Sequence, residues 1–180
     1  MAEQGLKTIL FSHEEIAEIV TRLGKEITEH YQGSDKELIV VGLLRGSFVF
    51  MADLVREIKL PMVTDFMTIS SYGDATESSG DVKVVMDLDE SIRDRDVLLV
   101  EDIIDTGNTF SKVVRMLQSR NPATLKICTL LNKPSRRKVE VDIDFCGVDI
   151  PDEFVCGYGL DYAQKFRNVP YIGIYEGPVG

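Results

Sequence analysis

Two adjacent carboxylates and a run of small polar residues are the groups in this chain most suited to ligand chemistry. Glu101 and Asp102 follow four apolar residues, 97–100, that are typical of a short buried strand. The polar run 105–109, Asp-Thr-Gly-Asn-Thr, comes next. Apolar residues then recur at helical spacing over 110–117. We therefore expect a strand, an acidic pair just beyond its end, a tight turn and a helix.

This order of elements indicates a phosphate site. A turn that opens a helix leaves backbone N–H groups unpaired, and the helix dipole adds partial positive charge at the same place. Gly107 has no Cβ, so a ligand can approach the backbone closely there. The carboxylates of Glu101 and Asp102 can accept hydrogen bonds from sugar hydroxyls or bind Mg²⁺.

The same residues also allow a simpler interpretation. Asp105 or Thr106 could cap the helix of an ordinary turn, with two solvated acids beside it. Unpaired acids at the buried end of a strand are costly, however, and Glu101 and Asp102 directly follow four apolar residues. The position of the acidic pair therefore favours a ligand site over a plain helix cap.

Polar residues also follow two other expected strands. Arg45 and Gly46 come after the apolar run 38–43, and Lys133 comes after the run 124–131. Because ligands bind at the carboxyl ends of strands in a parallel sheet, we expect these residues on one rim with the acidic pair. Taken alone, Arg45 with Gly46 fits a surface turn and Lys133 fits a solvated basic loop, and both alternatives stay open at this stage.

Alternating strand and helix patterns predict an α/β fold, with a mostly parallel central sheet flanked by helices, in a single domain over 1–180. Ser12 and Glu15 predict a capping box at the start of a helix whose apolar face reaches Ile27. The remaining expected elements are a helix over 47–58 and strands over 62–69, 82–86, 144–148, 154–158 and 171–175.

The composition limits the possible partners. Hydrophobic residues make up 44% of the 180 residues and charged residues 28%, which is typical of a globular protein. A net charge of −10 disfavours nucleic acid, which is bound by basic surfaces. No apolar run approaches the roughly 18 residues of a membrane span, and we expect no signal peptide. The three cysteines lack metal-binding spacing, so we expect reduced thiols in the cytoplasm.

The stretch Val100-Glu-Asp-Ile-Ile-Asp-Thr-Gly-Asn-Thr109 resembles the phosphoribosyl-pyrophosphate (PRPP) motif of type I phosphoribosyltransferases. Its aspartate at position 105 resembles the 6-oxopurine branch of that family, the hypoxanthine-guanine phosphoribosyltransferases. Further matches, in the family's order, are Leu43-Leu-Arg-Gly46, Ser71-Tyr72, Lys133, Phe154-Val155, Asp161-Tyr162 and Phe166-Arg167. The resemblance covers roughly residues 8–176. It implies the type I phosphoribosyltransferase fold, with a small hood and a mobile lid loop.

The resemblance implies a reaction in which a purine base replaces pyrophosphate at C1 of the ribose of PRPP. The residues implied for the 5′-phosphate are Asp105, Thr106, Gly107, Asn108 and Thr109. Those implied for the ribose hydroxyls are Glu101 and Asp102. Those implied for pyrophosphate are Arg45, Gly46 and Arg167. In the family, the peptide before the basic residue, here Leu44–Arg45, can be cis.

The resemblance also assigns residues to the purine. Lys133 matches the residue that donates a hydrogen bond to the 6-oxo group, Phe154 the aromatic that stacks on the ring, and Val155 a source of backbone groups at its edge. Core packing is the alternative for Phe154. The resemblance implies that Asp105 is the general base, which accepts a ring proton as the purine bonds to ribose.

A metal and a lid complete the implied site. Mg²⁺ is the implied cofactor, and its implied ligands are Asp161, Glu101 and Asp102. Segment 70–81 matches a lid whose Ser71 and Tyr72 close over the reaction centre and exclude water. A plain hairpin loop is the alternative for this polar segment.

We therefore expect a purine-salvage enzyme that converts hypoxanthine and guanine, with PRPP, to IMP and GMP. One alternative is a relative that prefers xanthine or guanine. A second is a PRPP-sensing regulator without catalysis on the same fold, and a third is a nucleotide-binding module with no set reaction. Asp105 and Lys133 favour the enzyme, because a sensor needs no group that reads the base. The family suggests a homodimer or homotetramer.

Overall fold

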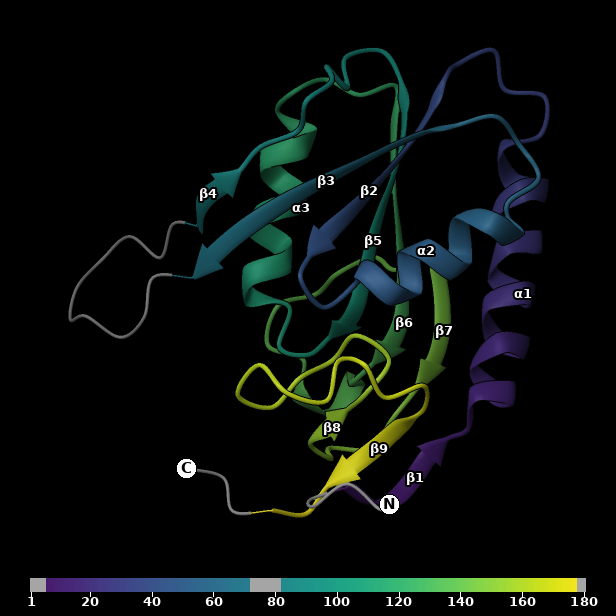
Figure 1. Cartoon of the computed structure of the whole chain (residues 1–180). Coiled ribbons are helices and arrows are strands. Elements are labelled where there is room, and N and C mark those ends of the chain that lie inside the picture. Colours follow the sequence, from purple (N-terminus) through teal and green to yellow (C-terminus); the bar gives the residue numbers. More distant parts are fainter. Residues whose placement is uncertain (1–5, 72–81, 178–180) are drawn as a thin grey trace.

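The computed structural model describes residues 6–71 and 82–177, and its centre is a six-stranded sheet (Figure 1). The strands of this sheet are β2 (Leu38–Leu44), β3 (Val63–Ser71), β4 (Val82–Met86), β5 (Asp96–Ile104), β6 (Thr124–Asn132) and β7 (Phe145–Asp149). They lie in the order β4-β3-β2-β5-β6-β7. Every neighbouring pair is parallel except β3 and β4, which are antiparallel. The predicted mostly parallel sheet is confirmed.

Helices cover both faces of this sheet. α1 (His13–Tyr31) and α2 (Phe48–Glu57) lie on one face, and α3 (Asn108–Gln118) lies on the other (Figure 1). Val40 belongs to the core beneath α1 and α2, whereas its neighbour Val41 belongs to the core beneath α3. Burial on both faces explains the unbroken apolar runs of the central strands. None of the helices formed by the described residues is long and apolar enough to cross a membrane.

α1 begins as its sequence predicts. The backbone N–H of Glu15 donates to Ser12 Oγ (3.2 Å), and the backbone N–H of Ser12 donates to Glu15 Oε2 (2.8 Å). These reciprocal hydrogen bonds form a capping box, which satisfies two N–H groups that the helix leaves free. The buried face of the helix extends past Ile27 to Tyr31.

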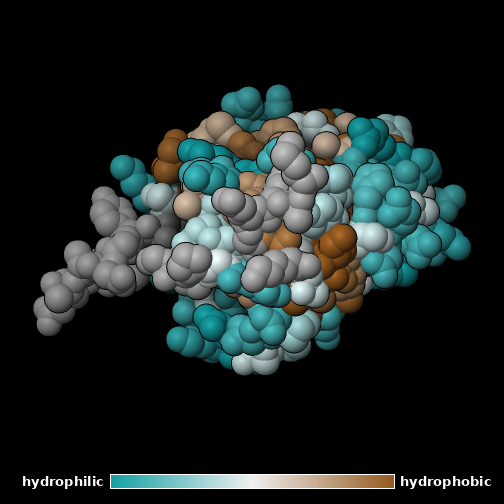
Figure 2. Space-filling model, turned by 60° about the horizontal axis from the view of Figure 1, so that its bottom comes forward, coloured by the Kyte–Doolittle hydropathy of each residue, from teal (hydrophilic) through white to brown (hydrophobic). Residues whose placement is uncertain are grey.

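A second, three-stranded sheet lies at the carboxyl end of the parallel strands (Figure 1). It consists of β1 (Leu6–Phe11), β9 (Ile172–Tyr175) and β8 (Val155–Cys156), all antiparallel. This sheet is the small hood that the family resemblance implies, although the sequence prediction lacks β1. Figure 2 looks onto this end of the molecule, where small hydrophobic patches lie among hydrophilic residues.

The acidic pair lies inside β5 rather than beyond its end, which corrects the predicted strand boundary. β5 continues to Ile104 because β6 continues to pair with it, with Glu101 opposite Thr129 and Ile104 opposite Asn132. The turn therefore begins at Asp105, directly after the last strand residue.

The strand predicted over 154–158 is also shorter than expected. β8 contains only Val155–Cys156, because Gly157 and Tyr158 have φ values of +102° and +52° that an extended strand cannot accommodate. The chain leaves the hood at this point and crosses beneath the ends of β5 and β6 before it returns as β9 (Figure 1).

Candidate active site

A cavity of about 220 Å³ opens at the carboxyl ends of β2 and β5. The predicted site residues that line it are Glu101, Asp105, Thr106, Gly107 and Thr109. Asn108, the remaining member of the predicted phosphate turn, begins α3 beside them. The structure thus brings the phosphate turn and one acid of the pair to a single space, at the sheet edge that the sequence indicates.

The N-cap of α3 is a glycine. Gly107 has a φ of +80°, so neither Asp105 nor Thr106 occupies the cap position, although Thr106 Oγ1 accepts a long hydrogen bond from the backbone N–H of Asn108 (3.4 Å). A Cβ at position 107 would collide with the carbonyl oxygen of Val139, so glycine is required by space as well as by conformation. The carbonyl oxygen of Thr106 accepts hydrogen bonds from the backbone N–H groups of Lys138 (2.9 Å) and Val139 (3.1 Å). These contacts hold the turn in place, so that the positive end of the α3 dipole lies at the cavity.

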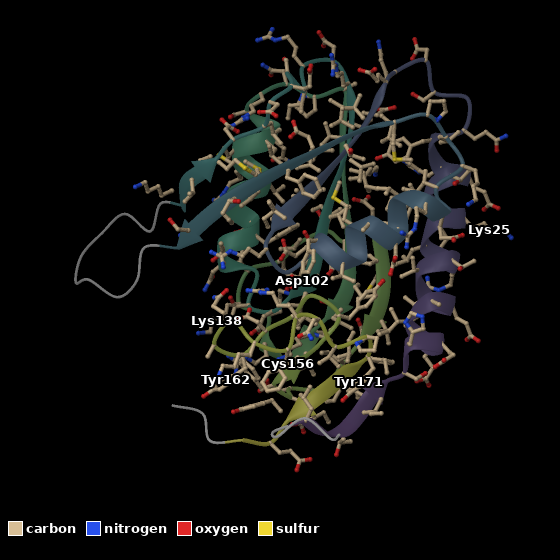
Figure 3. All side chains as sticks on the ribbon, in the orientation of Figure 1. Lys25, Asp102, Lys138, Cys156, Tyr162 and Tyr171 are labelled. Carbon is tan, nitrogen blue, oxygen red and sulfur yellow. The ribbon has the colours of Figure 1, made fainter. Side chains whose placement is uncertain are left out.

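Asp102, the second acid of the pair, contacts the turn that follows β2. Asp102 is only 7% exposed, and its Oδ1 accepts a hydrogen bond from the backbone N–H of Ile103 (2.9 Å). A Cβ at position 46 would collide with Oδ2 of Asp102, so glycine there lets the two segments meet. Figure 3 shows Asp102 near the centre of the molecule, where the strands end and the chain beyond β8 passes below.

Burial makes ionisation of this pair costly. Burial raises the pKa of Glu101 well above its usual range, and the neighbouring charge of Asp102 raises it further. Burial also raises the pKa of Asp102, although hydrogen bonds from Glu101 and Ile103 and the charge of Arg167 act in the opposite direction. A bound cation or donating hydroxyls would stabilise the ionised carboxylates, which is consistent with a site for ribose and metal.

Two of the three residues predicted for pyrophosphate, Arg45 and Arg167, contact the same glutamine. The Leu44–Arg45 peptide, which the family resemblance allows to be cis, is cis. Arg45 Nη1 donates to Gln164 Oε1 (2.8 Å), and Arg167 Nη2 lies 3.4 Å from the same oxygen. Sequence reasoning missed Gln164, which carries no motif signal of its own.

Arg167 is held by two further contacts. Its Nη2 pairs with Asp161 Oδ1 (2.7 Å), and its Nη1 donates to the carbonyl oxygen of Gly159 (2.7 Å). The backbone N–H of Gln164 donates to the other oxygen of Asp161 (2.8 Å). Asp161, one of the three predicted Mg²⁺ ligands, therefore forms an ion pair with Arg167, which is predicted to bind pyrophosphate.

Asp105, the predicted general base, pairs with an arginine that sequence reasoning missed. Arg136 Nε donates to Asp105 Oδ1 (3.2 Å), and its Nη1 lies 3.5 Å from Asp152 Oδ2. Arg136 lies in the basic loop after β6. Neither its position in the sequence nor its charge indicated that it would pair with Asp105 and Asp152. This ion-pair network connects the phosphate turn to the segment before Phe154.

Lys133 is not a solvated member of that loop. Its residue exposure is only 7%, and its backbone N–H donates to the carbonyl oxygen of Ile104 (3.0 Å), at the end of β5. Its ammonium group forms no ion pair with the carboxylates of residues 6–71 and 82–177. This position, at the end of β6 and beside the end of β5, is consistent with a role toward a ligand acceptor at the same edge of the sheet.

Phe154 is exposed, which makes core packing the wrong alternative for it. The side chain is 44% exposed, and its ring makes an edge contact with Tyr162 (centroids 5.8 Å apart). Val155 is buried in β8. Both belong to the hood, beside the Asp152 end of the ion-pair network. Of the predicted lid, Ser71 ends β3, whereas Tyr72 and positions up to 81 lie outside the described residues.

Comparison with known proteins establishes the family. A family model described as "Phosphoribosyl transferase domain" matches residues 7–163. The chain belongs to this family. It is 56% identical to the hypoxanthine phosphoribosyltransferase of Escherichia coli K12, over 92% of this chain and 93% of that protein. It is 47% identical to the hypoxanthine-guanine phosphoribosyltransferase of Bacillus subtilis, over 98% and 97% of the two chains.

Solved structures of phosphoribosyltransferases agree with the fold. A hypoxanthine phosphoribosyltransferase from Staphylococcus aureus matches with a TM-score of 0.90 and 47% identity, over 96% of this chain and 92% of that one. A Trypanosoma cruzi hypoxanthine phosphoribosyltransferase mutant, in a ternary substrates complex, matches with a TM-score of 0.90 and 37% identity, over 96% of each chain. The predicted type I phosphoribosyltransferase fold and the resemblance to the 6-oxopurine branch are confirmed.

The acidic pair of this phosphoribosyltransferase suits Mg²⁺ in its chemistry. Glu101 and Asp102 offer the oxygen ligands that Mg²⁺ prefers, and a cation would offset the cost of their burial. Within residues 6–71 and 82–177, no three His, Cys, Asp or Glu side chains form a group that could hold a metal by themselves. A metal at this site would therefore take other ligands from substrate oxygens and water.

Proposed function

We propose that this chain is a hypoxanthine phosphoribosyltransferase of purine salvage that also accepts guanine. It would convert the base and PRPP to IMP or GMP and pyrophosphate, as one domain over 1–180. The observation that carries the proposal is the cavity at the carboxyl ends of β2 and β5, which Glu101, Asp105, Thr106, Gly107 and Thr109 line. The names of relatives up to 56% identical support the choice of substrate.

In this proposal the phosphate turn anchors PRPP. The N-terminus of α3 and the hydroxyls of Thr106 and Thr109 hold the 5′-phosphate, since backbone N–H groups and the helix dipole favour an anion there. Glu101 and Asp102 accept hydrogen bonds from the ribose hydroxyls. Their negative charge also favours the cationic ribosyl centre that develops as pyrophosphate leaves.

The pyrophosphate of PRPP would bind between two arginines. Arg45 and Arg167 approach from different segments, and guanidinium groups bind phosphate oxygens in pairs. Mg²⁺, when bound, neutralises charge on the leaving pyrophosphate. Glu101 and Asp102 would hold the metal together with substrate oxygens, and Asp161 would join them when its pairing with Arg167 changes.

The purine would bind between Lys133 and the hood. Lys133 has only donors, so it pairs with a 6-oxo group and discriminates against the 6-amino group of adenine. Phe154 offers an exposed ring face for stacking. Asp105 would accept the ring proton of the purine, once Arg136 shifts its hydrogen bonds toward Asp152.

Location and assembly complete the proposal. All three cysteines, Cys128, Cys146 and Cys156, lie in the described residues and are free thiols, which fits a reducing cytoplasm. We propose a homodimer or homotetramer on the family resemblance. Sedimentation of the purified protein would distinguish these states from a monomer.

Steady-state kinetics tests this function directly. Purified protein with PRPP and Mg²⁺ is assayed with hypoxanthine, guanine, xanthine and adenine in turn. We expect turnover with hypoxanthine and guanine, little with adenine, and none in excess chelator. Turnover with xanthine or guanine alone would instead favour the xanthine- or guanine-preferring relative. Binding of PRPP without turnover on any base would overturn the enzyme assignment in favour of a PRPP sensor.

A further inference from the structure

Gln164 connects two arginines that come from opposite sides of the site. Its Oε1 accepts a hydrogen bond from Arg45 Nη1 (2.8 Å) and lies 3.4 Å from Arg167 Nη2. Arg45 follows β2 of the central sheet, whereas Arg167 lies in the chain between β8 and β9. One neutral amide oxygen thus holds two positive side chains that would otherwise repel each other.

The backbone around Gln164 is held in an unusual conformation. Ala163, Gln164 and Phe166 have φ values of +48°, +67° and +73°, in the left-handed region that side chains disfavour. The backbone N–H of Gln164 donates to Asp161 Oδ2 (2.8 Å), and Asp161 also pairs with Arg167. Surrounding contacts must maintain such strain, and it concentrates at functional sites. This conformation places the Gln164 amide between the two guanidinium groups.

We infer that Gln164 is a positioning residue for pyrophosphate recognition, which rests on the proposed function. Each guanidinium carries five N–H donors. Arg45 uses only one of them on Gln164, so the others stay available for phosphate oxygens. Because the amide is neutral, it aligns the two cations without cancelling their charge. Gln164 would thereby reduce the entropy that Arg45 and Arg167 lose when PRPP binds.

Calorimetric titration of PRPP, in the presence of Mg²⁺, measures this role. We expect Gln164→Ala to raise the Kd of PRPP about three- to tenfold, the fold-change of a typical net hydrogen bond, because Gln164 is exposed. The KM for PRPP should rise by the same factor, whereas kcat and the KM for hypoxanthine stay near wild type, because ground and transition states lose the same contact. Gln164→Glu keeps an oxygen acceptor but adds a negative charge beside both guanidinium groups, so its Kd for PRPP should also rise above that of the wild-type protein.

Two controls separate positioning from general destabilisation. Gln118→Ala makes the same change at an exposed position at the end of α3, and it should leave the Kd of PRPP unchanged. The second control is a double-mutant cycle: if Gln164 acts through Arg45, the effects of Gln164→Ala and Arg45→Ala on PRPP affinity are not additive.

Three results would overturn the inference. They are an unchanged Kd for PRPP in Gln164→Ala, additive effects with Arg45→Ala, and an equal loss of hypoxanthine affinity. Absence of PRPP binding by the wild-type protein is a different outcome, because it would refute the proposed function itself.

Discussion

Replacement of Asp105 by asparagine tests proton transfer with little change in the stability of the fold. Gly107, not Asp105, is the N-cap of α3, so the substitution removes no helix cap. The one ion pair that it removes among the described residues is with Arg136, and the two side chains are 42% and 48% exposed. Such an exposed pair contributes about 0–1 kcal/mol, so the free energy of unfolding should change by less than that.

Catalysis should respond far more strongly than stability. Asparagine keeps the shape of aspartate but cannot accept the ring proton of the purine, and a general base typically contributes about 10²–10⁴-fold. We therefore expect kcat of Asp105→Asn to fall by that factor while the Kd of PRPP changes little, because neighbouring backbone and hydroxyl groups hold the phosphate.

The assay combines single-turnover kinetics, PRPP titration and thermal unfolding on one preparation. Arg136→Ala is the matched control, since it removes the same ion pair but leaves the carboxylate of Asp105 in place. Its kcat should stay within about tenfold of wild type. Near-normal kcat in Asp105→Asn would refute the role of Asp105 as the base, and an equal fall in both variants would indicate that only the ion pair matters.

Other variants test the remaining parts of the site. Gly46→Ala places a Cβ against Asp102 Oδ2, so we expect a lower melting temperature, a stability loss of about 1–3 kcal/mol, and weaker PRPP binding by calorimetry. Glu101→Gln should raise the melting temperature of the ligand-free protein at pH 7. Folding raises the pKa of Glu101 above its ordinary value of 4.5, so ionisation of Glu101 opposes folding as the pH rises above that value. The increase in melting temperature should therefore disappear below pH 4.5. Lys133→Ala should lower kcat/KM for hypoxanthine about 10–100-fold and reduce the preference over adenine, measured with both bases.

Local patterns predicted the parts of the fold that local chemistry determines. The capping box at Ser12 and the glycine turn before α3 depend on residues within one helical turn, and both form as expected. The sheet edge that carries Arg45 and Lys133 follows from the apolar runs that precede them. These features need no knowledge of distant partners.

Contacts between distant segments account for what the sequence could not reveal. β5 extends to Ile104 because β6 pairs with it, and β1 forms because β9 offers an edge. Gln164 lies 119 positions from Arg45, and Arg136 lies 31 from Asp105. No local pattern distinguishes these side chains from ordinary surface residues.

The acidic pair explains why the central motif was nevertheless recognisable. Two neighbouring acids within a buried strand contradict the local rules of stable folding, and burial opposes the ionisation of both. Hydrogen bonds from Glu101 and Ile103 and the charge of Arg167 only partly offset the effect of burial on the pKa of Asp102. A hydrophobic pair at the same positions would cost less. Perturbed acids of this kind concentrate at functional sites, so the position of Glu101 and Asp102 within β5 supports the proposal that ribose and metal bind there.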